Sequence, residues 1–281
     1  MEKRFYTNKE LSNAEYHSGP GVSNSGLKLI GQKTPFHFWS RYIDPDRRNI
    51  DTSTKAQIIG TAIHAAALEP QKFDEEYVVA EGFAARNAKG FKAWAEGERR
   101  HILMPDEYDN VLGMRRSLWL HPVVYTLLED AFEFEYSIFA PDPITGVLCR
   151  VRLDLLTHSG WIVDLKKCQD ASPAGAAKAV ANYGYYHQAG FYQDVYAWAK
   201  DGELPRGFVF VFVEEQPPHA VGVYILARED VERGRREYRK NLNTYAHCLA
   251  RDDWPGYGNS AMTLDLPYWS RRNIDTNLES L

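Results

Sequence analysis

Between residues 131 and 167, apolar and polar side chains alternate with a period of two, and two short turn sequences interrupt the alternation. These turns, at 141–146 and 158–160, contain Gly together with Pro, Asp or Ser. The pattern predicts three consecutive strands, at residues 131–140, 147–157 and 161–167. Strands joined by such short turns pair antiparallel, so this stretch limits the chain to folds that contain a sheet of this kind.

Patterns of helical period surround the three predicted strands on both sides. Helices are predicted before them at residues 23–30, 56–68, 105–121 and 123–130. Two helices at 173–182 and 185–200, two strands at 208–213 and 221–226, and a helix at 228–249 are predicted after them. Residues 1–22 and the polar stretch 41–55 are expected to be loops. This order predicts an α/β fold with a mixed central sheet flanked by helices.

A chain of 281 residues without a visible linker is expected to form one domain. We expect its core at about residues 56–226, preceded by a helical segment at 16–55 and followed by a C-terminal helix and tail at 227–281. No apolar run is long enough to span a bilayer, and the N-terminus lacks the apolar core of a signal peptide. We therefore expect a cytoplasmic protein with no membrane partner.

The net charge of the chain is −5, whereas proteins that coat nucleic acid are usually basic. Contact with nucleic acid would therefore be confined to a local basic surface. One basic region has Phe91 and Trp94 between its cations and could bind phosphates and stack on an unpaired base. Its cations are Arg86, Lys89, Lys92, Arg99 and Arg100. A second basic region, in the predicted helix 228–249, alternates with Glu232 and Glu237, which favours a solvated helix face or a subunit contact.

Three cysteines, Cys149, Cys168 and Cys248, are far apart and lack paired spacing. This pattern favours buried free thiols over a disulfide framework, a zinc site or an iron–sulfur cluster.

Polar residues recur at every second position of the three predicted strands, so they point to one face of each strand. They are Glu133, Glu135 and Ser137 in the first strand, Arg150, Arg152 and Asp154 in the second, and Asp164 and Lys166 in the third. If the apolar faces all pack on the core, the carboxylates converge. Clustered carboxylates repel unless a cation holds them, and oxygen ligands favour Mg²⁺ or Mn²⁺. Together with a lysine, such a cluster suits phosphodiester hydrolysis.

A simpler interpretation is available for an isolated Asp-x-Lys in a strand, which is usually a charge pair on a solvated face. The flanking residues Ile162, Val163 and Leu165, together with Leu153 and Leu155, instead indicate central and buried strands. A buried cluster of charges needs an ionic partner or a metal.

Four elements of the sequence, in this order, resemble the RecB-like branch of the PD-(D/E)xK nuclease superfamily. They are Ser23-Asn-Ser25-Gly-Leu27 followed by Pro35, the helix Gly60-Thr-Ala-Ile-His64, the pair Arg152-Leu-Asp154 and Ile162-Val-Asp-Leu-Lys166, and Gln188-x-x-x-Tyr192. Within that branch, the chain resembles the RecE-like exonucleases (exonuclease VIII) and their phage or prophage relatives over roughly residues 16–215. The resemblance implies a restriction-endonuclease-like core.

The resemblance also implies a role for each matching residue. His64, Asp154 and Asp164 would be metal ligands together with the Leu165 carbonyl, and Glu135 is a further candidate ligand. Lys166 would activate or position the attacking water. Gln188 and Tyr192, which share one helical face, would orient Lys166 or the scissile phosphate.

Each of these residues has an alternative explanation that the sequence leaves open. His64 could be a core histidine, and Gln188 and Tyr192 could be ordinary helix surface and core. Glu135 could pair with Arg150 or Arg152 across the sheet, and these arginines could instead contact DNA phosphates.

The resemblance implies an Mg²⁺-dependent exonuclease, with Mn²⁺ as a substitute, that digests linear double-stranded DNA from its ends, from 5′ to 3′, for recombination by single-strand annealing. It also implies a homo-oligomeric ring around the duplex and a single-strand annealing protein as a partner. Neither an iron–sulfur cluster nor ATP is expected, because four cysteines and a Walker motif are both missing from the sequence. The alternatives are an endonuclease or single-strand nuclease of this superfamily, or a catalytically silent DNA-binding or phage-assembly protein.

Overall fold

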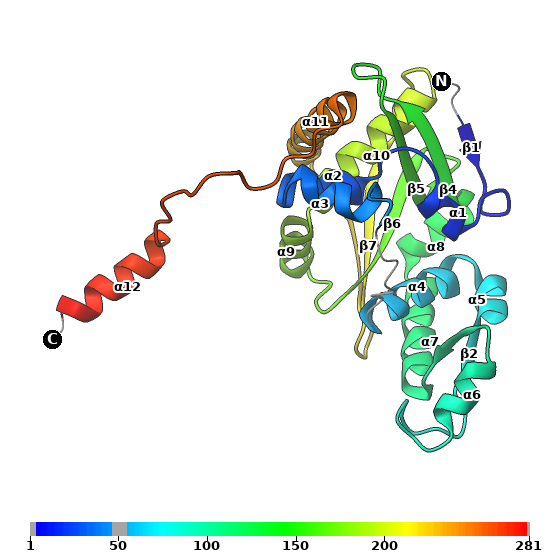
Figure 1. Ribbon diagram of the computed structural model, residues 1–281. Helices are drawn as coiled ribbons and strands as arrows, with labels where there is room; N and C mark the ends of the chain where they lie inside the picture. The colour runs from blue at the N-terminus through cyan, green and yellow to red at the C-terminus, as the bar shows by residue number, and fades with distance from the viewer. Residues whose placement is uncertain (1–3, 47–54, 280–281) are drawn as a thin grey trace.

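The structure is a computed structural model that describes residues 4–46 and 55–279. Its centre is a six-stranded sheet with the spatial order β1-β4-β5-β6-β7-β8 (Figure 1). The strands are β1 (Arg4–Tyr6), β4 (Ala131–Pro141), β5 (Leu148–Thr157), β6 (Trp161–Cys168), β7 (Gly207–Glu214) and β8 (Val221–Ile225). Neighbouring strands of this sheet are antiparallel except for β6 and β7, which are parallel. The predicted mixed sheet is therefore confirmed.

Helices cover both faces of the sheet, so the molecule has two main hydrophobic cores. The helices around the first core are α2 (Asn24–Gln32), α3 (Pro35–Tyr42), α9 (Pro173–Tyr183), α10 (Tyr185–Ala199) and α11 (Arg228–Arg251). The helices of the second core are α4 (Lys55–Leu68), α7 (Pro105–Leu120) and α8 (Pro122–Glu129). β7 shows why the sheet is buried on both sides. Its three phenylalanines, Phe208, Phe210 and Phe212, fill the first core, and the intervening valines fill the second.

The position of α10 is fixed by two glycines at its crossing with α11. A Cβ atom on Gly190 would lie 2.8 Å from the backbone nitrogen of Arg235, and one on Gly234 would lie 2.0 Å from the carbonyl oxygen of Tyr186. The two helix backbones therefore touch, and no larger residue fits at either position without a shift. A third glycine, Gly184, ends α9 with a φ of 62° and lets α10 start in a new direction.

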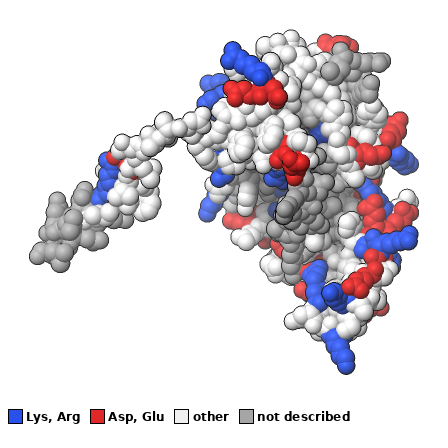
Figure 2. Space-filling view, in the orientation of Figure 1, with Lys and Arg blue, Asp and Glu red and all other residues white. Residues whose placement is uncertain are grey.

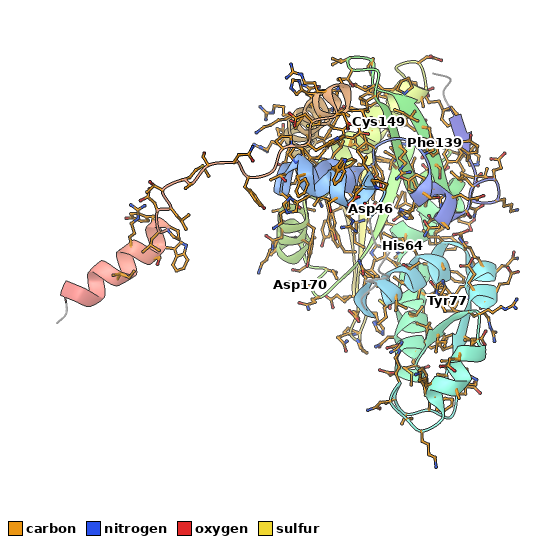
Figure 3. The ribbon with its side chains drawn as sticks, viewed as in Figure 1. Asp46, His64, Tyr77, Phe139, Cys149 and Asp170 are labelled. Atoms are coloured by element: carbon orange, nitrogen blue, oxygen red, sulfur yellow. The ribbon has the colours of Figure 1, made fainter. Side chains whose placement is uncertain are left out.

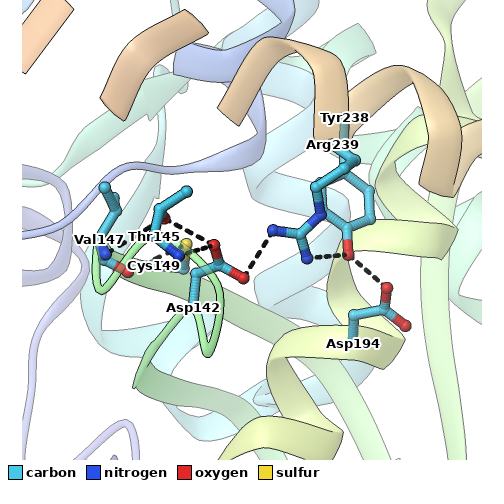
Figure 4. A network of polar contacts seen from close by, with 7 residues as sticks. All are labelled: Asp142, Thr145, Val147, Cys149, Asp194, Tyr238 and Arg239. Carbon is cyan, nitrogen blue, oxygen red and sulfur yellow. Dashed lines mark hydrogen bonds and ion pairs between the residues drawn. The ribbon is translucent and has the colours of Figure 1, made fainter. Parts of the chain in front are cut away.

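A buried polar network ties α11 to the turn between β4 and β5 (Figure 4). Asp142, which is fully buried, accepts hydrogen bonds from the Thr145 backbone and side chain and forms a 2.6 Å ion pair with Arg239. The hydroxyl of Tyr238 donates to Asp194 of α10. The network thus joins the β4–β5 hairpin, α10 and α11 on the side of the first core.

Residues 77–103 form a small projection that we call the distal arm. It contains β2 (Tyr77–Val79), α6 (Phe91–Gly97) and β3 (His101–Leu103), follows α5 (Pro70–Glu76), and lies at the lower end of the molecule in Figure 1. A separate small cluster of Ala80, Phe91 and Met104, flanked by Phe83 and Trp94, holds it together. Phe91 and Trp94, the two aromatic residues noted among the cations of the basic region, therefore belong to the core of the distal arm.

The chain after α11 forms a C-terminal tail, residues 252–279, that leaves the body and ends in α12 (Tyr268–Glu279) (Figure 1). Its first part touches α3, where the Phe36 N–H donates to the Pro255 carbonyl at 3.1 Å and the rings of His37 and Tyr257 lie 5.5 Å apart. Beyond Gly258 the described side chains of the tail are exposed, except that Ser270 is half-buried.

The N-terminal segment differs from the prediction of a loop over residues 1–22. It contains β1, which pairs with β4, and α1 (Asn13–Ser18), which starts with a capping box between Ser12 and Glu15. Arg150 donates to carbonyls at the end of α1, and Arg152 donates to the Leu11 carbonyl at 2.7 Å. Three-residue strands and one-turn helices have too little periodicity to be predicted without these distant partners.

Other predictions of elements are matched closely, with shifts of at most two residues at their ends. The predicted loop at 41–55 begins within α3, and its residues 47–54 lie outside the described part of the chain. Two of the cysteines, Cys149 and Cys248, are buried free thiols as predicted, whereas Cys168 is half-buried. None of the helices within residues 4–46 and 55–279 is long and apolar enough to cross a membrane.

Candidate active site

The central sheet opens into a fork between β5 and β6. The two strands pair at Leu155–Val163 and at Leu156–Ile162 and then diverge. From Asp164 onward β6 continues beside β7, with which it stays in register to its end. Asp154 directly precedes Leu155, whose pair with Val163 is the one nearest the opening, so Asp154 lies at the base of the fork. The fork therefore brings acids from two neighbouring strands to a place where the sheet is not closed.

Asp154 sits at a break in the alternation of β5. Leu153 and Leu156 pack in the first core, whereas Leu155 packs in the second. The Asp154 carboxylate turns toward α4 of the second core, where its Oδ2 lies 3.0 Å from Nε2 of His64. The same oxygen accepts a 2.8 Å hydrogen bond from the backbone N–H of Leu165. That amide is free to bond a side chain because β6 has left β5 at this point.

His64 is held by its own helix in an orientation that suits this contact. Its Nδ1 lies 2.7 Å from the Gly60 carbonyl oxygen, one turn earlier in α4, and donates to it. Nε2 then faces Asp154 and the fork. His64 is labelled in Figure 3, where α4 runs beneath the sheet.

Asp164 and Lys166 approach the fork from the face that α10 covers. Their neighbours Val163 and Leu165 fill the second core, so the alternation of β6 directs these two side chains to the first. Oδ2 of Asp164 lies 2.6 Å from Nζ of Lys166, and its Oδ1 accepts a 2.5 Å hydrogen bond from Gln188 of α10. Nζ of Lys166 also lies 4.9 Å from the centre of the Tyr185 ring, a cation–π contact.

Tyr192 and Glu135 complete the predicted set. The hydroxyl of Tyr192 shares a hydrogen bond with the Gln188 side chain, and burial raises its pKa well above the usual value. Glu135 lies opposite Asp154 in the register of β4 and β5, between the pairs Phe134–Leu155 and Tyr136–Leu153. Its φ of 48° is rare for a residue other than glycine, so the backbone of β4 is strained beside the fork.

The prediction of a single polar face is wrong, although the residues that it named do meet. Asp154 and its neighbour His64 come from the side of the second core, and Asp164 and Lys166 come from the side of the first. They approach each other because the strands separate, which the strict alternation of the sequence could not reveal. The two arginines expected on that face are engaged with carbonyl groups of residues 11–19, so they hold the N-terminal segment.

Burial and mutual charge shift the pKa values of the cluster in opposite directions. Burial raises the pKa of Asp164 to about 6 despite the Lys166 charge, and burial together with Asp154 raises the pKa of Glu135 to about 7. Burial also acts on Asp154, but His64 and Lys166 hold its pKa below the usual value. For His64 the penalty of burial is outweighed by Asp154, which raises the histidine pKa to about 9.

The donor types at the fork fit a divalent cation. They are one imidazole, three carboxylates and a backbone carbonyl at the strand end, a set that suits Mg²⁺ or Mn²⁺. Oδ2 of Asp164 is fully buried and, apart from its ion pair with Lys166, has no hydrogen-bond donor among the described residues. In the described part of the chain, no three His, Cys, Asp or Glu side chains are grouped closely enough to hold a metal as they stand. His64 and Lys166 instead supply the positive charge that balances the acids.

Two residues that the sequence did not single out also belong to this region. Tyr185 lies three positions before Gln188 on the same face of α10, so helical spacing could have identified it. Glu69, directly after α4, acts on the pKa of Glu135 through its charge, and its carboxylate accepts a hydrogen bond from Asn8. No pattern in the sequence distinguishes Glu69 from the other acids that follow it.

Comparisons with known proteins identify the family and a structure of similar fold. The family model described as "PDDEXK-like domain of unknown function (DUF3799)" matches residues 23–266. A crystal structure titled "putative exonuclease" from Eubacterium rectale has a similar fold, with a TM-score of 0.63 and 12% sequence identity over 95% of this chain and 97% of that one. Among curated proteins there is no match. The match to the family covers every residue discussed at the fork except Asn8.

Proposed function

The chain belongs to the DUF3799 family of PDDEXK-like domains, and we propose that it is a metal-dependent deoxyribonuclease that digests linear duplex DNA from its ends. The observation that carries this proposal is the fork itself. Asp154 and the Asp164–Lys166 pair meet there with His64. These are the kinds of groups that metal-assisted hydrolysis of a phosphodiester uses. Every position of the set holds a competent residue, which disfavours a silent DNA-binding protein.

PDDEXK nucleases generally use divalent metal ions, and the proposed ligands here are His64, Asp154, Asp164 and the Leu165 carbonyl, with Glu135 as a further ligand. A bound Mg²⁺ or Mn²⁺ would polarise the phosphate and lower the pKa of a coordinated water. If Asp164 bound such a cation, its 2.6 Å ion pair with Lys166 would open, and the ammonium group would be free to hold the attacking water or the phosphate. Tyr185, Gln188 and Tyr192 keep Lys166 and Asp164 in place.

The finer parts of the proposal rest on the RecE-like resemblance. They are digestion from 5′ to 3′, a role in recombination with a single-strand annealing partner, a phage origin, and a ring of identical subunits around the duplex. Neither ATP nor an iron–sulfur cluster has a part in the proposal.

The test is a time course with linear duplex DNA labelled separately at each 5′ and 3′ end, with Mg²⁺ and with EDTA. We expect release of label from the 5′ ends first and no cleavage of closed circular duplex. Cleavage of the closed circle would contradict the requirement for ends and favour an endonuclease. Preferential digestion of single strands would favour a single-strand nuclease, and no hydrolysis in any metal would support a binding protein.

A further inference from the structure

The C-terminal tail carries an apolar segment that has no place to pack on its own body. Met262, Leu264 and Leu266 are 77%, 94% and 54% exposed, and Thr263 and Asp265 stand between them. Alternation of this kind is the pattern of a strand with one apolar face. Large apolar side chains gathered on one exposed segment usually mark a site of interaction.

The sheet offers a matching acceptor at its far edge. β8 pairs with β7 on one side and is the last strand of the sheet, so its other side is an open edge among the described residues. Its sequence, Val-Gly-Val-Tyr-Ile, contains neither a charge nor a proline. Charged side chains and prolines usually protect an edge strand from pairing with another chain. β8 has neither, so it is an exposed template for an added strand.

An apolar groove lies beside this edge, on the face that an added strand would cover. It has a volume of about 340 Å³ and lies between α9, the end of β8 and the start of α11. Its walls include Ala177 and Val180 of α9, Phe212 of β7, and Tyr224 and Ile225 of β8. Ile225 itself is 64% exposed. Alternate side chains of a strand laid along β8 would enter the groove, which is how added strands obtain specificity.

The tail of the same molecule lies away from this groove while its first part stays on α3. The groove lies at the N-terminal end of α11, and the tail departs from the other end of that 24-residue helix, about 36 Å away at 1.5 Å per residue. The tail is held at Pro255 and Tyr257. The five residues from Tyr257 to Met262 span at most about 18 Å.

We propose that residues 262–266 of one copy of this chain add as a strand to the open edge of β8 in a second copy, with Met262, Leu264 and Leu266 in its groove. Each copy has one tail and one edge, so the contact is head-to-tail and either closes into a ring or continues as a filament. The proposal is independent of the nuclease activity, because none of these residues lies at the fork.

The test is cross-linking between two variants that each add one cysteine to the three natural ones, Leu264→Cys and Ile225→Cys, mixed and oxidised. We expect a disulfide-linked species of twice the 32.2 kDa chain mass that disappears on reduction. The matched control pairs Leu264→Cys with Ile144→Cys, which is 74% exposed on the β4–β5 turn, several strands away from β8, and should give no such product above the background of the natural cysteines. A Leu264→Cys, Ile225→Cys double variant that links only within one chain would overturn the proposal, as would no link at all.

Light scattering on the full chain supplies a second measurement. We expect self-association of the wild type, and at least tenfold weaker association for the variant Leu264→Ser with Leu266→Ser. The control Ile144→Ser, at a site that is 74% exposed on the β4–β5 turn, should associate like the wild type. A monomeric wild type at tens of micromolar, or a double variant that associates as well as the wild type, would contradict a tail-to-edge contact.

Discussion

The fork and the distal arm both concentrate charged residues, but they place them in opposite surroundings. At the fork, Asp164 is 2% exposed and is fixed by Lys166 and Gln188. On the arm, Lys89, Lys92 and Arg99 are exposed, and within the described residues their side chains make no ion pair. Cationic side chains show at the lower tip of the molecule in Figure 2. Arg86 and Arg100 of the arm are ion-paired with Glu107 and Glu98, but the three exposed cations are free where Lys166 is fixed.

This difference separates two tasks that a nuclease must perform. Buried charges interact strongly and shift each other's pKa values, so each has a defined geometry and a distinct role. Exposed cations are screened by salt and act on a phosphate backbone as a group, with little dependence on which one is present. We therefore expect single changes at the fork to alter the chemistry and combined changes on the arm to alter binding alone.

The largest effect is expected from Asp164→Asn, which keeps the size of the side chain and its contact with Gln188 but removes the charge. The rate of hydrolysis of linear duplex should fall by at least about 10³-fold, because a metal ligand and the ionic partner of Lys166 are lost together. Circular dichroism should show a folded protein. An active Asp164→Asn enzyme would rule out this carboxylate as a ligand.

A smaller loss is expected from Gln188→Leu, since this residue acts on Asp164 rather than on the substrate. Removal of such supporting contacts typically lowers metal affinity or activity by about 10- to 100-fold, and higher Mg²⁺ should restore part of the rate. The matched control is Gln193→Leu, another buried glutamine of α10, whose side chain donates to the Ala189 carbonyl away from the fork. Equal losses in the two variants would indicate a general effect on packing.

The ionisation of Glu135 in its buried surroundings should be visible in the stability of the metal-free protein. Because its pKa is raised from 4.5 to about 7, the folded state holds a proton that the unfolded state has lost between these values, and stability falls as the pH rises through that window. Glu135→Gln should therefore increase the free energy of unfolding by about 1–2 kcal/mol at pH 8 and leave it unchanged at pH 4. Urea unfolding at both pH values in EDTA measures this difference, and equal effects at the two values would contradict a raised pKa.

The smallest effect on the enzyme is expected from the arm variant Lys89→Gln, Lys92→Gln, Arg99→Gln. Its affinity for duplex DNA should be lower, and its salt dependence shallower by up to about three units of slope, with an unchanged rate at saturating DNA and unchanged stability. The control is Arg236→Gln with Lys240→Gln on α11, which are equally exposed. A fall in the saturated rate of the arm variant would show that the two regions are not separate in function.

The sequence predicted the parts of this molecule that depend on repetition. The strands at the fork, the helix of His64 and the Gln188–Tyr192 pair all follow from period two or period 3.6, and the structure brings them together. The side from which each acid arrives could not be predicted, because it depends on the break at Asp154 and on the divergence of β5 from β6. Glu69 and β1 were missed for a similar reason, since only partners distant in the sequence define them, whereas α1 has only six residues, too few for a helical period to show.

The hydrogen bond from the Leu165 amide to Asp154 gives this one backbone proton an unusual position. The amides of its neighbours Asp164 and Lys166 point to β7 and are protected by the sheet, but protection of the Leu165 amide depends on a side chain across the fork. Its exchange with deuterated solvent should therefore report on the ionisation and rotation of a single carboxylate. Nuclear magnetic resonance could follow the state of the fork through this amide while the rest of β6 serves as an internal reference.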